Sequence, residues 1–291
     1  MDILTNYTFQ IVALGSVLLA VAAAPVGAFS VYKGQSLIGD AIGHSTFPGI
    51  ILAYMAFATR SPIILLAGAI LAGAASYALI QLAHRDKRLG LDANLAIFLS
   101  GFFGLGMALK SFIQGNPDYA GASQAGLGTY IFGQAAYMLE ADVLLIAAIS
   151  ALVLTLLLLF YKELKLFVFD AEYAEVVGLP CRLLNLLLLV MTIAVIGIGI
   201  KAVGAILISS FLIIPCVAAN QWSNNFARVL LLSSLIGAVS ALVGTYISTL
   251  EQGMSTGPSI ILVASLIAFF SIVFGTKGIL GSVLKRRRTH G

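Results

Sequence analysis

Charged side chains are scarce in this sequence. Only 10% of its 291 residues are Asp, Glu, Lys or Arg, 60% are apolar, and the mean hydropathy is +1.05. About a quarter of the residues of a soluble domain are charged, because its surface faces water. A soluble fold of this length is therefore excluded, and lipid must solvate much of the chain. Because no polar stretch is long enough to form a separate domain, we expect one membrane domain over residues 1–291.

Cysteine and the common catalytic motifs are also scarce or missing. The sequence has two cysteines, Cys181 and Cys216, and no CxxC pair, which argues against a thiolate zinc site or a redox motif. It contains no GxxxxGK[ST] phosphate-binding loop, no GxSxG and no HExxH. We therefore expect a chain that is not an enzyme and that does not hydrolyse ATP itself.

Long apolar runs make up most of what is present. A membrane-spanning helix needs roughly 20 apolar residues. The sequence offers runs of this kind at about 9–31, 36–58, 62–83, 92–113, 140–162, 184–201, 203–219, 228–250 and 257–275. They predict an all-α polytopic bundle of about nine transmembrane helices, with a range of 8–10. Three prolines inside these runs, Pro25, Pro48 and Pro215, should kink or interrupt their helices.

The distribution of basic residues predicts the orientation. With the N-terminus outside, 13 of the 16 Lys and Arg residues fall on the inner side and 3 (Arg60, Lys110 and Lys201) on the outer side. Cytoplasmic loops are enriched in Lys and Arg, so we expect the N-terminus outside and the C-terminus in the cytoplasm. The basic tail 284–291 marks the cytoplasmic side of a membrane, and we do not expect nucleic acid as a partner.

Asp40 and His44 form the one constellation with evident chemistry. They lie inside the second predicted span, four residues apart, so on a helix they share a face. A carboxylate at mid-membrane depth costs roughly 2.5–3.5 kcal/mol on insertion scales, which makes such a residue a functional candidate. An oxygen and an imidazole nitrogen together suit Mn²⁺, Fe²⁺ or Zn²⁺. A hydrogen bond that only satisfies both groups, or a proton relay, is the alternative interpretation.

The connection over 162–183 predicts a short helix between two spans. Asp170 can cap it, Glu172 and Glu175 follow, and Gly178 and Pro180 would end it. A short cytoplasmic helix is a natural docking surface, and an ordinary amphipathic connector is the alternative.

Several of these segments resemble one known family. GQSLIGDAIGHSTFPG, residues 34–49, resembles the signature around the second span of the permease subunits of manganese, zinc and iron ABC importers. FDAEYAEVVGLP, residues 169–180, resembles the coupling helix of that family. Residues 203–219 and 255–266 resemble its closing spans, so the similarity extends over nearly the whole chain in the same order. The resemblance implies a fold like that of the type II ABC importers.

The family also implies partners and site residues. A permease of this kind lies in the cytoplasmic membrane of a prokaryote, surrounded by lipid, and pairs with a second permease copy as a homodimer. A separate ATP-binding subunit drives it, and an extracytoplasmic metal-binding protein delivers the ion. The family's metal pathway uses an Asp and a His that correspond to Asp40 and His44, where Mn²⁺ or Zn²⁺, with Fe²⁺ as a third candidate, would bind in transit without any permanent cofactor. The residues assigned to ATPase coupling, on the helix at about 169–180, are Asp170, Glu172, Glu175 and Gly178.

One position departs from the family pattern. Gly43 precedes His44 where Ser is common, and this change should affect helix packing rather than the identity of the ligands.

Other classes of membrane protein remain open from the residues alone. An ion-gradient-driven transporter or channel would use Asp40 and His44 as a proton relay and would need no ATPase. A permease for a metal chelate or a vitamin would want a wider pathway without the Asp–His pair. A membrane scaffold would leave the intramembrane carboxylate unexplained.

The charge count makes a topological prediction. A reporter fused after Arg288 should be active in the cytoplasm, and one inserted near Asn116 should be accessible only from outside, because the basic residues divide 13 to 3. Protease or labelling access to each reporter measures this. Two reporters on the same side would overturn the assignment of spans.

Overall fold

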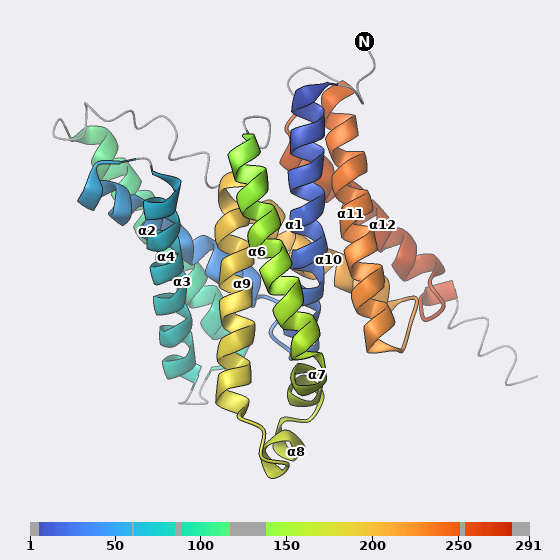
Figure 1. Cartoon of the computed structure of the whole chain (residues 1–291). Coiled ribbons are helices and arrows are strands. Elements are labelled where there is room, and N and C mark those ends of the chain that lie inside the picture. Colours follow the sequence, from blue (N-terminus) through green and yellow to red (C-terminus); the bar gives the residue numbers. More distant parts are fainter. Residues whose placement is uncertain (1–5, 60, 85–88, 117–137, 251–253, 281–291) are drawn as a thin grey trace, which may run out of the picture.

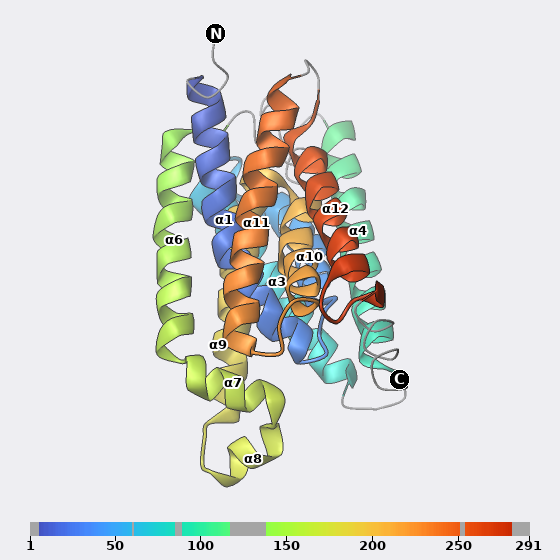
Figure 2. The same ribbon diagram turned by 90° about the vertical axis from the view of Figure 1, so that its right-hand side faces the viewer.

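The computed structural model describes residues 6–59, 61–84, 89–116, 138–250 and 254–280, and helices make up nearly all of these segments. The helices are α1 (Tyr7–Tyr32), α2 (Ile38–Phe57), α3 (Pro62–His84), α4 (Leu91–Gly115), α6 (Glu140–Leu159), α7 (Tyr161–Phe169), α8 (Ala171–Val176), α9 (Cys181–Val203), α10 (Ala205–Asn220), α11 (Phe226–Leu250) and α12 (Thr256–Phe274). They form an elongated bundle in which the first turn of α1 and the short helix α8 lie at opposite ends (Figures 1 and 2).

Each of the nine predicted ranges coincides with a helix, which confirms the all-α polytopic bundle. Seven of the described helices are long and apolar enough to cross a membrane. The other two matches are α10, which is apolar but has only 16 residues, and α2, whose 20 residues include Asp40 and His44. Most of the connection between α4 and α6, residues 117–137, and the basic tail 284–291 lie outside the described residues.

The chain reverses sharply between the predicted ranges 184–201 and 203–219. Gly204 has φ +86° and separates α9 from α10. A Cβ on Gly199 would lie 2.7 Å from Ile208 Cδ1. In a continuous helix these two residues would be about 13 Å apart along the axis. Helices α9 and α10 therefore pack against each other as a tight hairpin. The residue that connects them needs a positive φ, which glycine adopts easily because it has no Cβ.

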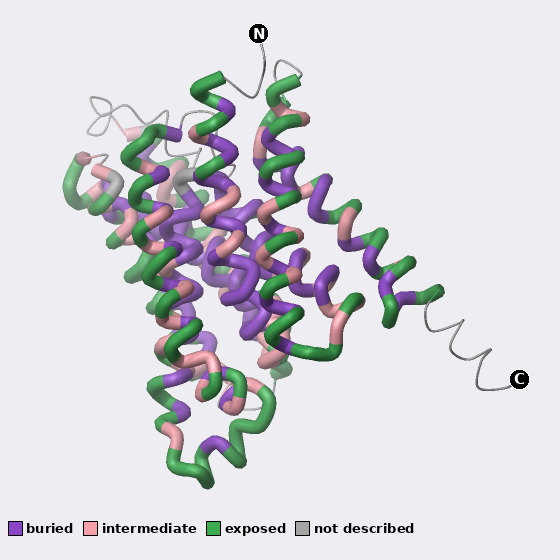
Figure 3. The backbone as a smooth tube through the Cα atoms, turned by 45° about the vertical axis from the view of Figure 1, so that its right-hand side comes forward, coloured by how far each residue is buried: buried purple, intermediate pink, exposed green. Residues whose placement is uncertain are grey.

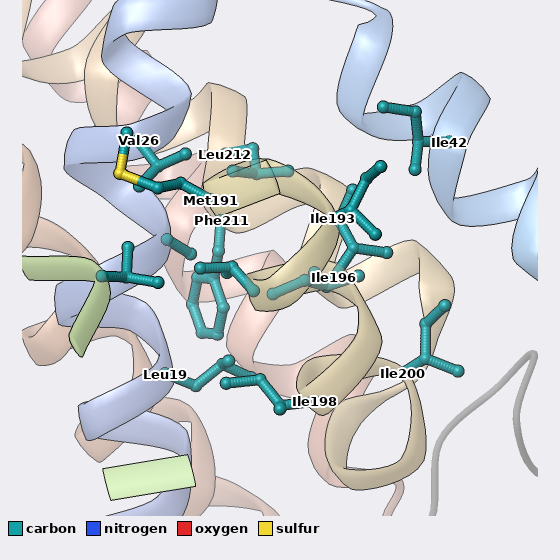
Figure 4. Packing of buried hydrophobic residues seen from close by; sticks show 14 of the residues in the cluster. Leu19, Val26, Ile42, Met191, Ile193, Ile196, Ile198, Ile200, Phe211 and Leu212 are labelled. Atoms are coloured by element: carbon teal, nitrogen blue, oxygen red, sulfur yellow. The ribbon is translucent and has the colours of Figure 1, made fainter. Parts of the chain in front are cut away.

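Helices α1, α9 and α10 form the centre of the bundle. In the most apolar window of α1, 72% of the residues are buried, compared with 11% in α4. Figure 3 shows the buried residues gathered along the middle of the molecule, with exposed residues on the outer faces. Leu19, Met191, Phe211 and Leu212 interlock where these three helices meet (Figure 4). A helix that is apolar all round, such as α1, belongs in such a position.

Glycine allows several of these helices to approach closely. A Cβ on Gly27 of α1 would collide with the backbone of Leu212 in α10, and Gly49 of α2 and Gly68 of α3 face each other in the same way. Of the glycines in the run 101–106, only Gly106 makes such a contact, against Phe47 and Pro48 of α2. Lipid tails are as apolar as the helices, so close packing of small residues supplies much of the attraction between them.

The prolines do not interrupt their helices. Pro25, Pro48 and Pro215 lie inside α1, α2 and α10, and each helix continues through its proline. The structure excludes an interruption, because neighbouring helices at these positions can support a segment that has lost one backbone hydrogen bond. A kink, the other part of the prediction, stays a prediction.

Helix α7 is fixed to α1 and α11 by aromatic rings. Phe169 packs against Tyr32 of α1 with 5.3 Å between ring centroids and against Phe226 of α11 with 5.2 Å. Phe29 contacts Phe226 at 4.9 Å, and Tyr161 stacks on the same ring. Edge-to-face pairs of this kind add about 0.5–1.5 kcal/mol each beyond the area that they bury. The segment that leads to α8 is therefore anchored to the end of α1.

The close contact at Gly27 predicts a loss of stability on substitution. Gly27→Ala should lower the thermal stability of the detergent-solubilised chain, by roughly 1–3 kcal/mol, because the backbone of Leu212 cannot rotate away from the new methyl group. Gly43→Ala is the matched control, since its Cβ would meet only the carbonyl oxygen of Ala205 at 3.9 Å. Equal melting temperatures for both variants would contradict the packing described here.

Candidate functional site

Asp40 and His44 lie together on α2, as the sequence predicts. His44 Nε2 is 3.5 Å from Asp40 Oδ1, and the side chains are 18% and 33% exposed for His44 and Asp40 respectively. Their helix neighbours Ala41, Ile42 and Gly43 are buried. The two polar groups therefore occupy the one face of this part of α2 that the chain leaves partly open.

Helix α2 is held in place by its other faces. Gly49 packs on Gly68 of α3, and the Ser45 hydroxyl lies 2.7 Å from the Ser76 hydroxyl of the same helix. On the side of α4, the Phe103 ring meets the His44 ring edge-on, with 5.0 Å between the centroids. These contacts orient the imidazole before any ligand arrives.

The local backbone favours a negative charge and leaves one carbonyl without its helical donor. Asp40 lies in the first turn of α2, whose N-cap, Leu37, makes no side-chain hydrogen bond. Unpaired N–H groups and the helix dipole stabilise a carboxylate at such a position. Pro48 has no N–H to donate to the carbonyl of His44, one turn earlier in the helix. The His44 carbonyl therefore lacks its usual helical hydrogen bond.

Other polar atoms near the pair are already engaged. Ser45 Oγ donates to the Ala41 carbonyl at 2.6 Å, and Thr46 Oγ1 donates to the Gly43 carbonyl at 2.7 Å. Within the described part of the chain, no group of three or more His, Cys, Asp or Glu residues could hold a metal ion. This chain therefore offers two side chains of the kinds that bind metal ions, and any further ligands of an ion would have to come from elsewhere.

The opposite face of α2 is apolar. Ile38 and Ile42 turn toward α9, where they line a small cavity together with Leu188 and Thr192 (Ile42 is labelled in Figure 4). Gly39 lies against α10, since its Cβ would be 2.5 Å from Leu212 Cδ1. Helix α2 thus separates the Asp–His face from the packed centre of the bundle.

The four residues predicted for coupling gather at α8, away from Asp40. Asp170 Oδ1 accepts a hydrogen bond from the Tyr173 N–H at 2.9 Å, which caps the helix as predicted. At the other end, Gly178 has φ +87°, its N–H donates to Glu175 O, and Leu179 N–H donates to Ala174 O. This pair of bonds is a Schellman motif, which favours glycine because of the left-handed backbone.

The surface of α8 is exposed and partly apolar. Glu172 and Glu175 face outward, together with Tyr173 (55% exposed), Val176 (84%) and Val177 (55%). Because α8 projects beyond the end of the bundle (Figure 2), these side chains lie clear of the long helices.

Sequence reasoning missed a polar cluster at the C-terminal end of α1. The Lys33 ammonium group donates to Asn185 Oδ1 of α9, and Asn185 Nδ2 donates to the Tyr77 hydroxyl of α3 at 3.0 Å. From the sequence Lys33 counted only as one basic residue beside a span. Its one distinguishing signal is its place directly before Gly34 and the segment that contains Asp40.

The chain is similar to known membrane subunits over nearly its whole length. The profile of the ABC 3 transport family matches residues 5–275. The zinc transport system membrane protein TroC of Treponema pallidum is 39% identical over 289 residues, covering 99% of this chain and 96% of that protein. The manganese transport system membrane protein MntC of Bacillus subtilis is also 39% identical, over 96% of this chain and 65% of that protein.

A solved structure has the same fold. The structure of PsaBC from Streptococcus pneumoniae in complex with Fab superposes with a TM-score of 0.81 and 26% identity, covering 94% of each chain. Together with the helical bundle and the match over residues 5–275, this shows that the chain belongs to the ABC 3 transport family as a multi-pass membrane subunit.

Proposed function

We propose that this chain is the permease through which an ABC importer takes up Mn²⁺ or Zn²⁺, with Fe²⁺ as a third candidate, and that Asp40 and His44 bind the ion in transit. The relatives that are 39% identical are described as zinc and manganese transport proteins. ATP hydrolysis belongs to a separate subunit. The metal is the cargo, and the chain needs no permanent cofactor.

The distance between Asp40 and His44 carries this proposal. A hydrogen bond between such groups is usually 2.7–3.2 Å long, whereas His44 Nε2 and Asp40 Oδ1 are 3.5 Å apart. Two ligand atoms about 2.0–2.2 Å from a tetrahedral Zn²⁺ ion lie roughly 3.4 Å from each other. The observed spacing is thus closer to that of two ligands of one ion than to that of a hydrogen-bonded pair.

A second copy of the chain would complete the site. Asp40 and His44 are partly open in the single chain, and the neighbouring helix α4 is the least buried of the seven long apolar helices. Gly101 and Gly104 of α4 have open space where a Cβ would lie, which suits close contact with another helix. A homodimer formed over this face would bring two Asp–His pairs together as an Asp₂His₂ set.

The outward face of α8 supports docking of the ATP-binding subunit. It carries three exposed apolar or aromatic side chains, Tyr173, Val176 and Val177, next to the exposed acidic residues Glu172 and Glu175. Apolar groups that protrude at the end of a bundle are typical of a protein interface. The first turns of α9 and α11, with Arg182 and Arg228, lie toward the same end, which supports a cytoplasmic location for α8 and an outer N-terminus (Figure 2). An extracytoplasmic metal-binding protein would approach the opposite end.

The gradient-driven alternative is weaker. Membership of the ABC 3 transport family favours ATP as the energy source. A proton relay through Asp40 and His44 would instead make uptake depend on the proton gradient and leave it unaffected by loss of the ATP-binding subunit.

The ligand role predicts a loss of transport without a loss of folding. Asp40→Ala and His44→Ala should each reduce metal uptake to background, while membrane insertion and detergent stability are retained, because both side chains are partly exposed and neither has a short hydrogen bond. Uptake of Mn²⁺ and Zn²⁺ in cells, together with the yield and melting temperature of each variant, measures both effects.

Gly43→Ser is the matched control for these variants. It adds a hydroxymethyl group next to His44, and its Cβ would have only the Ala205 carbonyl oxygen within 4 Å, at 3.9 Å, so uptake should be unchanged. Full uptake by either alanine variant would overturn the ligand role. If the pair were only structural, removing one residue would leave the other without its partner, and the variant would be less stable.

The docking role of α8 predicts a graded effect at Gly178. Gly178→Val should uncouple ATP hydrolysis from uptake, because a β-branched residue is strained at φ +87°, whereas Gly178→Asn should retain much of the activity. Glu172→Arg should weaken co-purification of the ATP-binding subunit by reversing an exposed charge. Uptake per ATP and co-purification are the measurements. Normal values in Gly178→Val and Glu172→Arg would remove this segment from the mechanism.

A further inference from the structure

Lys33 lies where three parts of the bundle meet. It follows the last residue of α1 and precedes Gly34, whose φ of +75° turns the chain toward α2. Its ammonium group donates to Asn185 Oδ1 of α9 and lies 4.9 Å from the centroid of the Phe167 ring of α7. One side chain therefore contacts both α7 and α9 from the connection that leads into α2.

The contact with Asn185 continues into α3. Asn185 Nδ2 donates to the Tyr77 hydroxyl at 3.0 Å, and Gln81 Nε2 donates to the same oxygen at 2.6 Å. Ser30 and Ile38 line a cavity of about 10 Å³ beside these groups, which is near the lower limit for one water molecule. Little free space is therefore left among these groups. Their hydrogen bonds and the ring contact hold the ends of α1, α3, α7 and α9 in one arrangement.

The charge of Lys33 has no ionic partner among the residues that the structure describes. An amide oxygen and an aromatic face hold it instead. Burial lowers the pKa of Lys33 to about 8. A neutral apolar side chain would avoid this desolvation, so packing alone does not explain why a lysine stands here.

We propose that Lys33 is a positioning residue for transport, which links α7 and α9 to the first turn of α2. This inference rests on the proposed function, in which α8 docks the ATP-binding subunit and Asp40 binds the metal. When α8 is displaced by its partner, α7 moves with it, and the contacts of Lys33 with Phe167 and Asn185 pass that displacement to the α1–α2 connection. Asp40 follows in the first turn of the next helix.

The aromatic contacts of α7 support the same route. Phe169, the last residue of α7, packs on Tyr32, the residue before Lys33. The end of α7 therefore meets the end of α1 through two adjacent residues, one aromatic and one charged. The chain between Phe169 and α8 is the single residue Asp170, which caps α8, so there is little slack between the docking helix and this contact.

The test uses the complete transporter in proteoliposomes, with its ATP-binding and metal-binding proteins, and whichever of Mn²⁺ or Zn²⁺ the unmodified transporter imports. Lys33→Met, which keeps the length of the side chain without its charge, should lower the metal imported per ATP about tenfold, because a hydrogen bond to a charged group is lost. Equilibrium metal binding and ATP hydrolysis should be retained. Lys33→Arg should restore most of the ratio, since the guanidinium group stays charged and also packs on aromatic rings.

Lys110→Met is the matched control. Lys110 is a half-buried lysine on α4, outside this cluster, so the ratio should not change. If Lys33→Met fails to insert, Phe167→Leu tests the same link by removing the aromatic face while keeping an apolar side chain, and the ratio should again fall.

The outcomes separate this inference from the function on which it rests. A purely structural lysine predicts that uptake and ATP hydrolysis fall together with the amount of folded protein, at a constant ratio, and that result would overturn the proposal. An unchanged ratio in a stable Lys33→Met transporter, or in Phe167→Leu if the first variant fails to insert, would overturn it as well. If the unmodified transporter imports neither metal with ATP, or if Asp40→Ala imports normally, the proposed function itself fails.

Discussion

The close approach of helix backbones at glycine is the interaction on which the rest of this structure depends. Gly27 lets α1 meet the backbone of α10, and Gly49 and Gly68 let α2 lie directly on α3. In lipid, helices gain little by burying apolar side chains against one another, so the fit between surfaces decides which faces touch. With α2 pressed against α3 on one side and α10 on another, Asp40 and His44 are left on its remaining face. The position of the polar pair is thus a consequence of where the small residues are.

The same packing explains what the sequence could and could not predict. The apolar runs, the cap at Asp170 and the end of α8 at Gly178 were predictable, because each depends on residues adjacent in the chain. The break between α9 and α10 was predicted from two adjacent apolar runs, but its exact place at Gly204 was not, since the pattern on either side is equally apolar. The continuous helices at Pro25, Pro48 and Pro215 depend on neighbouring helices that no local pattern reveals.

The candidate site also has one part that the sequence predicts and one part that it does not. The spacing of Asp40 and His44 placed them on one face, and the structure brings them to 3.5 Å. The cluster around Lys33 joins residues from α1, α3, α7 and α9 that are far apart in the sequence, so no spacing could indicate it. Lys33 and Asp40 are nevertheless close along the chain. Because the chain turns at Gly34, the Lys33 side chain points into the bundle, whereas the Asp40 carboxylate lies on the partly exposed face of α2.

The proposed ligand role of Asp40 and His44, two residues on one helix, also constrains how metal selectivity could arise. Sites of nitrogen and oxygen bind Zn²⁺ more tightly than Mn²⁺ whatever protein supplies them, unless the geometry opposes it. Two partly exposed side chains, with no third ligand among the described residues, impose little geometry of their own. If Mn²⁺ is the cargo, its selection over Zn²⁺ must therefore occur before the ion reaches α2, at the protein that delivers it, or through the geometry of a site completed by a second chain. As the proposed ligands, Asp40 and His44 would by themselves provide weak coordination, and an ion that has to leave again within each transport cycle requires coordination of that kind.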